Sequence, residues 1–346
     1  MRQLPLLFAA TIAIAAMPVF AQESGSDGPY HVIKTAKVGG DGGFDYVYAD
    51  SAGRKLYIPR LGRPSGHVTV YDLDTLAPLG DIPDTNAHGV AADAKSHHAF
   101  ASSKPVAMWD TQTLKLIKTI DVDGGPDGIL DDSYNQRVYV FSHGAPNATV
   151  IDAKTGAVLG TIDLGGAPEQ AQSDGHGKIY VDLEDQGAVA VVDAKTMKVA
   201  ATYSLNGKAS GLSGLGLDAK NHVLFVACRK PASMVMLDAN TGKYLADLPI
   251  GDGCDGAGFN PATMEAFASV GQSGALSIIK EKSPTSFAVE QTLKTMPGAR
   301  TMTIDFKTNH VFTMAGEYQA PQPGETGRGR RAMVPGSFTI VEVGKG

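Results

Sequence analysis

The sequence is poor in cysteine, in tryptophan and in long apolar segments. Cys228 and Cys254 are its only cysteines, which excludes a C-x-x-C metal or redox motif. Its longest apolar stretch runs from Leu4 to Ala16, too short for a bilayer-spanning helix of about 20 residues. We therefore expect no membrane span. The formal charge of −6 disfavours indiscriminate binding to phosphate groups.

The motifs of the commonest hydrolase and nucleotide-binding sites are also missing. The chain has no G-x-S-x-G elbow, no H-E-x-x-H pair and no G-K-[ST] phosphate loop. Gly251-x-Gly253-x-x-Gly256 matches the dinucleotide fingerprint in its letters. A turn at Phe259-Asn260-Pro261 follows it, however, where that fingerprint requires a helix. No motif therefore predicts a cofactor.

The first 21 residues have the pattern of a cleavable export signal. Arg2 precedes the apolar stretch, and Val19-Phe20-Ala21 gives the small-x-small pattern that signal peptidase reads. We expect residues 1–21 to be a signal peptide and residues 22–29 a short linker. The protein is accordingly predicted to be periplasmic or secreted.

Glycine is abundant, with 41 residues, and the chain carries an internal repeat. The first repeat signal is Asp or Asn followed six residues later by an apolar pair, as in Asp132 with Val138-Tyr139. The seven anchors lie 39 to 45 residues apart: Asp50, Asp93, Asp132, Asp174, Asp218, Asn260 and Asp305. A nearly constant period of this length is typical of propeller blades or other repeat arrays.

A second signal alternates with the first. It is an apolar run that ends in Asp, with Thr three residues later, as in Val70-Tyr71-Asp72 with Thr75. Further copies end at Asp110, Asp152, Asp193 and Asp238, and the last two units carry Lys280 and Glu342 instead. Asp and Thr bond to nearby backbone groups in tight turns, so a structural role is favoured over a chemical one.

Each unit is predicted to form four short strands, which makes the chain an all-β, seven-bladed β-propeller with four-stranded blades. The last unit lacks its fourth strand, since the sequence stops soon after Val341-Glu342-Val343. Tyr30–Thr35 resembles the outer strands of other units, so we expect this N-terminal strand to complete the last blade and close the ring. Residues 30–346 would then be one domain, with a Pro-, Gly- and Arg-rich loop at 316–336 in its last blade.

The units resemble the YVTN-type propeller repeat. Arg137-Val138-Tyr139-Val140 and Lys55-Leu56-Tyr57-Ile58 stand at its signature strand, and Thr149-Val150-Ile151-Asp152 stands before the following turn. Together with the export signal, this makes the chain similar to the periplasmic YncE-like family over residues 30 to 343. The resemblance implies the fold and leaves the activity open, because relatives include proposed nucleic-acid binders, cell-surface proteins and, more distantly, lactonases.

In a propeller, the starts of inner strands and the ends of second strands open on one face around the central channel. The starts are Asp45, His88, Asp127, Glu169, Ser213, Asp255 and Arg300. The ends are Arg60, Ser103, His143, Glu184, Arg229 and Glu317. The candidate ligand-binding residues are Asp45, Arg60, His88, Asp127, His143, Glu169, Arg229, Asp255, Arg300 and Glu317.

Metal binding is left open by these residues. Asp45, Asp127, Glu169 and Asp255 offer some of the six to eight oxygen ligands that Ca²⁺ takes. A transition metal would instead prefer the two histidines with a carboxylate, although no spacing demands it. The prediction is no metal and no cofactor, with Ca²⁺ or another divalent cation as the alternative.

Two further features lie outside this set. Cys228 ends the second strand of unit five and Cys254 begins the inner strand of unit six, so a disulfide between neighbouring blades is predicted, with two separate thiols as the alternative. The inserted loop carries the one concentrated basic patch, Arg328, Arg330 and Arg331, a candidate for binding phosphate or an acidic partner.

Three functions fit these observations. The leading one is a non-catalytic exported propeller that binds a small or polymeric ligand, or a macromolecular partner, at the channel face. The rival is a lactone hydrolase in which Asp127 or Glu169 acts as general base and Arg300 or a cation polarises the carbonyl. The third is nucleic-acid binding through Arg60, Arg229 and the basic loop, which the net charge disfavours.

Overall fold

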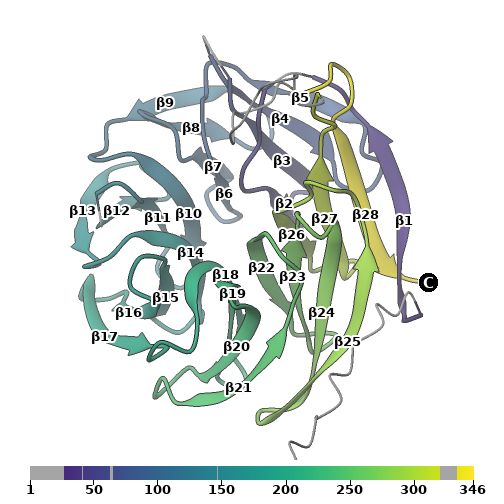
Figure 1. The fold of residues 1–346 in the computed structure, drawn as a ribbon. Coiled ribbons are helices and arrows are strands. Elements are labelled where there is room, and N and C mark those ends of the chain that lie inside the picture. The colour runs from purple at the N-terminus through teal and green to yellow at the C-terminus, as the bar shows by residue number, and fades with distance from the viewer. Residues whose placement is uncertain (1–26, 41, 63–64, 146, 320–332) are drawn as a thin grey trace, which may run out of the picture.

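The computed structural model describes residues 27–40, 42–62, 65–145, 147–319 and 333–346. These residues form strands, turns and loops, with no helix among them. The strands make seven four-stranded antiparallel sheets that are arranged as blades around a common centre (Figure 1). The predicted fold, an all-β seven-bladed propeller, is confirmed.

Within each blade the strands follow one another from the centre outward. The first four blades comprise β2 (Tyr48–Asp50), β3 (Lys55–Arg60), β4 (His67–Asp72) and β5 (Pro78–Ile82); β6 (Val90–Asp93), β7 (His98–Ala101), β8 (Val106–Asp110) and β9 (Leu116–Ile120); β10 (Pro126–Asp132), β11 (Arg137–Ser142), β12 (Asn147–Asp152) and β13 (Val158–Asp163); and β14 (Pro168–Ser173), β15 (Lys178–Leu183), β16 (Ala188–Asp193) and β17 (Lys198–Ser204). The last three comprise β18 (Ser210–Asp218), β19 (Val223–Lys230), β20 (Ala232–Asp238) and β21 (Tyr244–Pro249); β22 (Cys254–Asn260), β23 (Glu265–Val270), β24 (Ala275–Ser283) and β25 (Ser286–Lys294); and β26 (Met302–Asp305), β27 (His310–Ala315), β28 (Thr339–Lys345) and β1 (Tyr30–Lys37).

The N-terminal strand closes the ring as expected. β1 pairs antiparallel with β28, from Tyr30 opposite Lys345 to Lys37 opposite Thr339, and it is the outer strand of the last blade. In Figure 1 the purple β1 accordingly runs beside the yellow β28. Strand pairing thus joins the two ends of the propeller, and the last blade is as complete as the others.

The repeated Asp and Thr residues hold turns, as their spacing predicts. Asp72 Oδ1 accepts hydrogen bonds from the backbone N and the hydroxyl of Thr75, both at 2.7 Å. The equivalent pairs at Asp110, Asp152 and Asp238 make the same two bonds. These bonds favour the ionised carboxylate and lower the pKa of Asp72. The signal is therefore structural.

Apolar clusters between neighbouring blades form the core. Trp109 is fully buried, and its ring lies 5.8 Å from that of Tyr57 in the preceding blade. Between the fifth and sixth blades, Phe225 stacks on Phe259 at 5.0 Å. A Cβ at Gly214 would lie 2.6 Å from the backbone N of Ala257, so this glycine lets the two inner strands approach closely. The core thus fixes the blades, and with them the loops of the channel face.

The expected disulfide is not formed, which corrects that prediction. Cys228 and Cys254 are both buried free thiols. The thiol of Cys228 donates to Val226 O at 3.6 Å, and that of Cys254 donates to Gly256 O at 3.5 Å. Burial raises the pKa of both thiols, to about 11 for Cys254. Each thiol is therefore accommodated within its own blade, as in the alternative of two separate thiols.

Two predicted segments fall outside the described residues: the signal peptide at 1–21, and Arg328, Arg330 and Arg331 of the basic loop. Across the described part of the chain, no helix has the length and hydropathy needed to span a bilayer.

Candidate functional site

Charged side chains from successive blades meet at one mouth of the channel. Asp45 and His88 stand in the loops that lead into β2 and β6, whereas Asp127, Glu169 and Asp255 lie at the starts of β10, β14 and β22. Because the blades repeat one register, residues at these positions reach the same face of the ring. Arg300 precedes β26 in the same way, and His143, Glu184 and Arg229 come from the ends of second strands.

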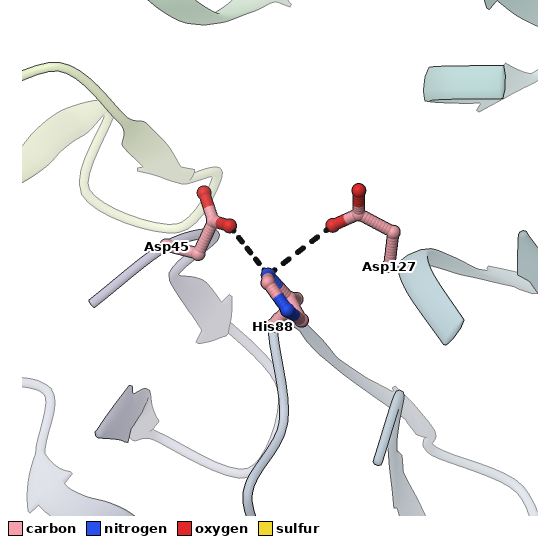
Figure 2. A group of neighbouring side chains, drawn as sticks. All are labelled: Asp45, His88 and Asp127. Carbon is pink, nitrogen blue, oxygen red and sulfur yellow. Dashed lines mark hydrogen bonds and ion pairs between the residues drawn. The ribbon is translucent and has the colours of Figure 1, made fainter. Parts of the chain in front are cut away.

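The first group comes from three consecutive blades (Figure 2). Nδ1 of His88 lies 2.7 Å from Asp45 Oδ2 and 3.4 Å from Asp127 Oδ1. Ser102 holds the backbone on which two of these residues stand, since its hydroxyl donates to Asp127 O and accepts at 2.8 Å from the N of Gly89, the residue after His88. The imidazole therefore stands between two carboxylates that different blades supply.

The second group lies beside the first and has a similar composition. Nε2 of His143 is 3.1 Å from Glu184 Oε2 and 3.8 Å from Glu169 Oε2. Gln170 anchors the strand of Glu169, because its side chain bonds to the backbone of Leu215 and of Ala257. One amide thus ties three neighbouring inner strands together behind the second group.

Two arginines link the groups through Asp255. Arg229 pairs with Glu184 and with Asp255. Arg300 lies 2.8 Å from Asp255 and 3.6 Å from Asp45, measured between guanidinium nitrogen and carboxylate oxygen. The nine side chains form what we call the mouth ring: Asp45, His88, Asp127, His143, Glu169, Glu184, Arg229, Asp255 and Arg300.

The mouth ring is acidic and unevenly charged. Its five carboxyls and two guanidinium groups leave three more negative than positive charges when all five carboxyls are ionised and both histidines are neutral. The arginines stand on the fifth and seventh blades, each between two carboxylates, whereas blades one to four contribute the histidines and four of the acids. The excess negative charge therefore lies on the side of blades one to four.

Burial and proximity shift the proton affinities of this face. The hydrogen bond to Asp45 raises the pKa of His88, which favours the imidazolium. Burial, reinforced by the charge of Asp127, raises the pKa of Glu169 to about 8. Burial also raises the pKa of Asp127 and of Asp255. Shifted values of this kind cluster at functional sites.

A channel of about 490 Å³ runs behind the mouth ring, and Tyr46 and Glu169 are among its lining residues. The hydroxyl of Tyr46 is buried and has no hydrogen-bond partner among the residues that the structure describes. Burial raises the pKa of this hydroxyl, and so do the negative charges of the nearby carboxylates, which are Glu169, Asp127, Asp45 and Asp255. A buried hydroxyl without a partner is costly, so this position suits a bound ligand or water.

Eight of the ten residues predicted from the sequence stand in the mouth ring, and two do not. Arg60 is buried, stacks on Phe338 at 3.8 Å and donates to Gly39 O at 3.2 Å. Glu317 lies 3.9 Å from Lys37 and is largely exposed. Glu184 is in the mouth ring and was among the channel-face positions identified from the sequence, although not among the ten candidate residues. Tyr46 was not predicted, because a tyrosine beside an inner strand cannot be distinguished by sequence from a core residue.

No family model matches the chain, so the YVTN-type repeat remains a resemblance of sequence pattern. The uncharacterized protein YncE of Salmonella typhi and its namesake from Salmonella typhimurium are each 24% identical to the chain over 197 residues. The match covers 54% of the chain, and it spans about half, 54%, of the length of each relative.

The chain is a seven-bladed propeller that is similar to YncE over about half of its length. Two solved structures share its fold at low sequence identity. A chain of the mitotic checkpoint complex superposes with a TM-score of 0.67 at 11% identity, covering 90% of this protein and 96% of that chain. The WD40 repeats of RRP9 give a TM-score of 0.71 at 10% identity, covering 92% and 99%. At these identities the likeness concerns the fold alone.

Proposed function

We propose that the protein is an exported binding propeller that holds a small, positively charged ligand at the mouth ring. The observation that carries this proposal is the convergence of five carboxylates and two histidines from several blades on one acidic face. Both arginines are paired with carboxylates, so the attraction for a cation is strongest over Asp127 and Glu169 once these two carboxyls are ionised.

The negative charge of the mouth ring also opposes the third function, nucleic-acid binding, at this end of the channel. A phosphate backbone is bound by unpaired Lys and Arg side chains, whose contacts release counterions. Arg229 is engaged by Glu184 and Asp255, while Arg60 is buried against Phe338. Neither residue therefore supports the role that the third function gave it.

A binding experiment tests the proposal. The melting temperature of the purified protein is measured with arginine, spermidine and choline as cationic probes, and with citrate and a short oligonucleotide as anionic ones. A ligand that binds only the folded state raises this temperature. At pH 9, where Glu169 is ionised, we expect a shift with at least one cation, weakened about tenfold in affinity by Glu169→Gln.

Glu317→Gln is the matched control, because it removes an exposed carboxylate from outside the mouth ring and should leave the shift unchanged. Stabilisation by the oligonucleotide and by none of the cations would refute the proposed ligand class.

Hydrolysis of a lactone is a second candidate function, favoured by Glu169. With a pKa raised to about 8, this buried carboxyl exchanges a proton near neutral pH. As general base it would take a proton from the water that attacks the carbonyl carbon, and it would return that proton to the ring oxygen when the C–O bond breaks. Arg229, which acts electrostatically on Glu169, replaces Arg300 as the cation beside this base.

Release of acid from sugar lactones, followed in a pH-stat, tests this second function. Turnover that Glu169→Gln lowers at least about a hundredfold would support it, since general-base catalysis contributes roughly 10²–10⁴-fold. Turnover unaffected by the substitution would exclude Glu169 as the base.

A further inference from the structure

The group of Asp45, His88 and Asp127 has a feature that a histidine hydrogen bond leaves unexplained. Two carboxylate oxygens approach the same ring nitrogen, Nδ1 of His88, at 2.7 and 3.4 Å (Figure 2). A ring nitrogen carries one hydrogen or one lone pair, so it makes one good hydrogen bond. The second carboxylate oxygen then has no well-aligned hydrogen bond to this nitrogen. A cation among the three atoms would satisfy all of them at once.

The spacing of these donor atoms suits a small metal ion. The three ligand atoms lie within 4.8 Å of one another. Protein nitrogen and oxygen atoms bind such an ion at about 2.0–2.2 Å, which places neighbouring ligands of a tetrahedral or octahedral site roughly 3–3.5 Å apart. Of the two separations from Nδ1, the 3.4 Å distance falls within that range and the 2.7 Å distance lies just below it. The required movements are therefore within the reach of side-chain rotation.

The donor set selects the class of ion. Ca²⁺ takes six to eight oxygens, and imidazole is not among its usual ligands. The four acids considered for Ca²⁺ also do not form one cluster. Asp255 pairs with Arg229 and Arg300, and Glu169 lies beside His143 in the second group. One imidazole with two carboxylates instead suits a divalent first-row transition metal.

We propose that Asp45, His88 and Asp127 bind a divalent first-row transition-metal ion such as Zn²⁺. This rests on the proposed function, because the ion is one kind of cation that the mouth ring would hold. Two carboxylates balance its charge, and three protein ligands leave coordination positions for water or a further ligand.

The surroundings support this assignment. Arg300 lies 3.6 Å from the second oxygen of Asp45, where it orients the carboxylate as outer-shell groups of metal sites do. The hydroxyl of Tyr46 is buried without a partner among the described residues, and the charges of Asp45 and Asp127 contribute to raising its pKa. The His88 side chain is 40% exposed, which gives an ion a path from solvent.

The second group provides a matched comparison within the same mouth ring. His143, Glu169 and Glu184 also bring three donor atoms within 4.8 Å of one another. Glu184, however, is already paired with Arg229, and His143 lies 3.1 and 3.8 Å from its two carboxylates. A metal there would have to displace an arginine, so the group with His88 is the expected site.

Titration calorimetry of the full chain with Zn²⁺ alone, after treatment with EDTA, tests the proposal. We expect one equivalent to bind, with an affinity that falls at least about a hundredfold in His88→Ala and in Asp127→Asn. His310→Ala is the control, because its imidazole also lies 2.8 Å from a carboxylate, that of Glu342, but stands outside the mouth ring, and it should retain binding. His143→Ala removes the histidine of the second group and so distinguishes the two groups. Circular dichroism and melting of the metal-free variants verify that each one folds.

Substitution with Co²⁺ gives a second readout, since the visible absorption of the bound ion should be lost in His88→Ala and kept in His143→Ala. Zn²⁺ binding lost in His143→Ala and kept in His88→Ala would overturn the assignment, as would no binding at millimolar Zn²⁺. Binding of spermidine or arginine without any binding of Zn²⁺ would refute the metal site and leave the proposed function standing. If neither class binds, both proposals fall.

Discussion

Glu281 and Asp218 form a buried carboxyl pair between the sixth and fifth blades. Glu281 is 2% exposed, and its Oε1 accepts a hydrogen bond from Asn221 Nδ2 at 2.9 Å. Its Oε2 and Asp218 Oδ2 are both buried without a hydrogen-bond donor. Burial, together with the charge of Asp218, raises the pKa of Glu281 to about 7. A protonated Glu281 can donate to the neighbouring Asp218 side chain, which an ionised Glu281 cannot do.

Stability should therefore depend on pH through Glu281. Its folded-state pKa lies above the value of about 4.3 for an unfolded glutamate, so the native state binds more protons between these pH values. The free energy of unfolding then falls as pH rises from about 4.3 to 7. Glu281→Gln, whose amide donates at every pH, should stabilise the protein by about 1–3 kcal/mol at pH 8 and by much less at pH 4.5. Urea denaturation at both values measures this, and an equal effect at the two would contradict it.

At the scale of strands and turns, the sequence is a good guide because the repeat is local. The six-residue step from Asp132 to Val138-Tyr139 covers the end of β10, a turn and the start of β11. The unit whose anchor is Asn260 in place of Asp forms the same elements, β22 and β23. Turn chemistry and strand alternation act over a few residues, so the pattern contains what is needed to place each strand and its face.

The partners of side chains at the mouth could not be predicted in this way. Arg60 and Arg229 both stand near the end of a second strand. Arg60 is buried against Phe338, which lies about 280 residues away in sequence. Arg229 instead pairs with Glu184 and Asp255 in the mouth ring. The two cysteines also occupy neighbouring blades, yet each thiol bonds to its own strand. Such choices depend on contacts between blades, which a local pattern does not contain.

At the scale of the whole molecule, the ring is held shut where β1 meets the sixth and seventh blades. Beyond its pairing with β28, Tyr30 exchanges two backbone hydrogen bonds of 2.9 Å with the side chain of Gln291. Its hydroxyl donates to Glu265, and its ring packs edge-on against Phe267 at 5.4 Å. One residue thus fastens the closing strand to the blade beside it. Because every blade contributes to the mouth ring, closure also fixes the geometry of the candidate site.

Tyr30 should therefore contribute strongly to global stability. Tyr30→Ala removes a fully buried aromatic ring and should lower the free energy of unfolding by about 3–5 kcal/mol. Tyr30→Phe keeps the ring but removes one donor to the buried Glu265, which still accepts from Lys345, so a smaller loss of about 1–3 kcal/mol is expected. Tyr134→Ala is the control, because that side chain is 52% exposed and lies away from the closure. Guanidinium denaturation gives all three values. Near-equal stabilities of Tyr30→Ala and Tyr134→Ala would mean that pairing of β1 with β28 closes the ring without this contact.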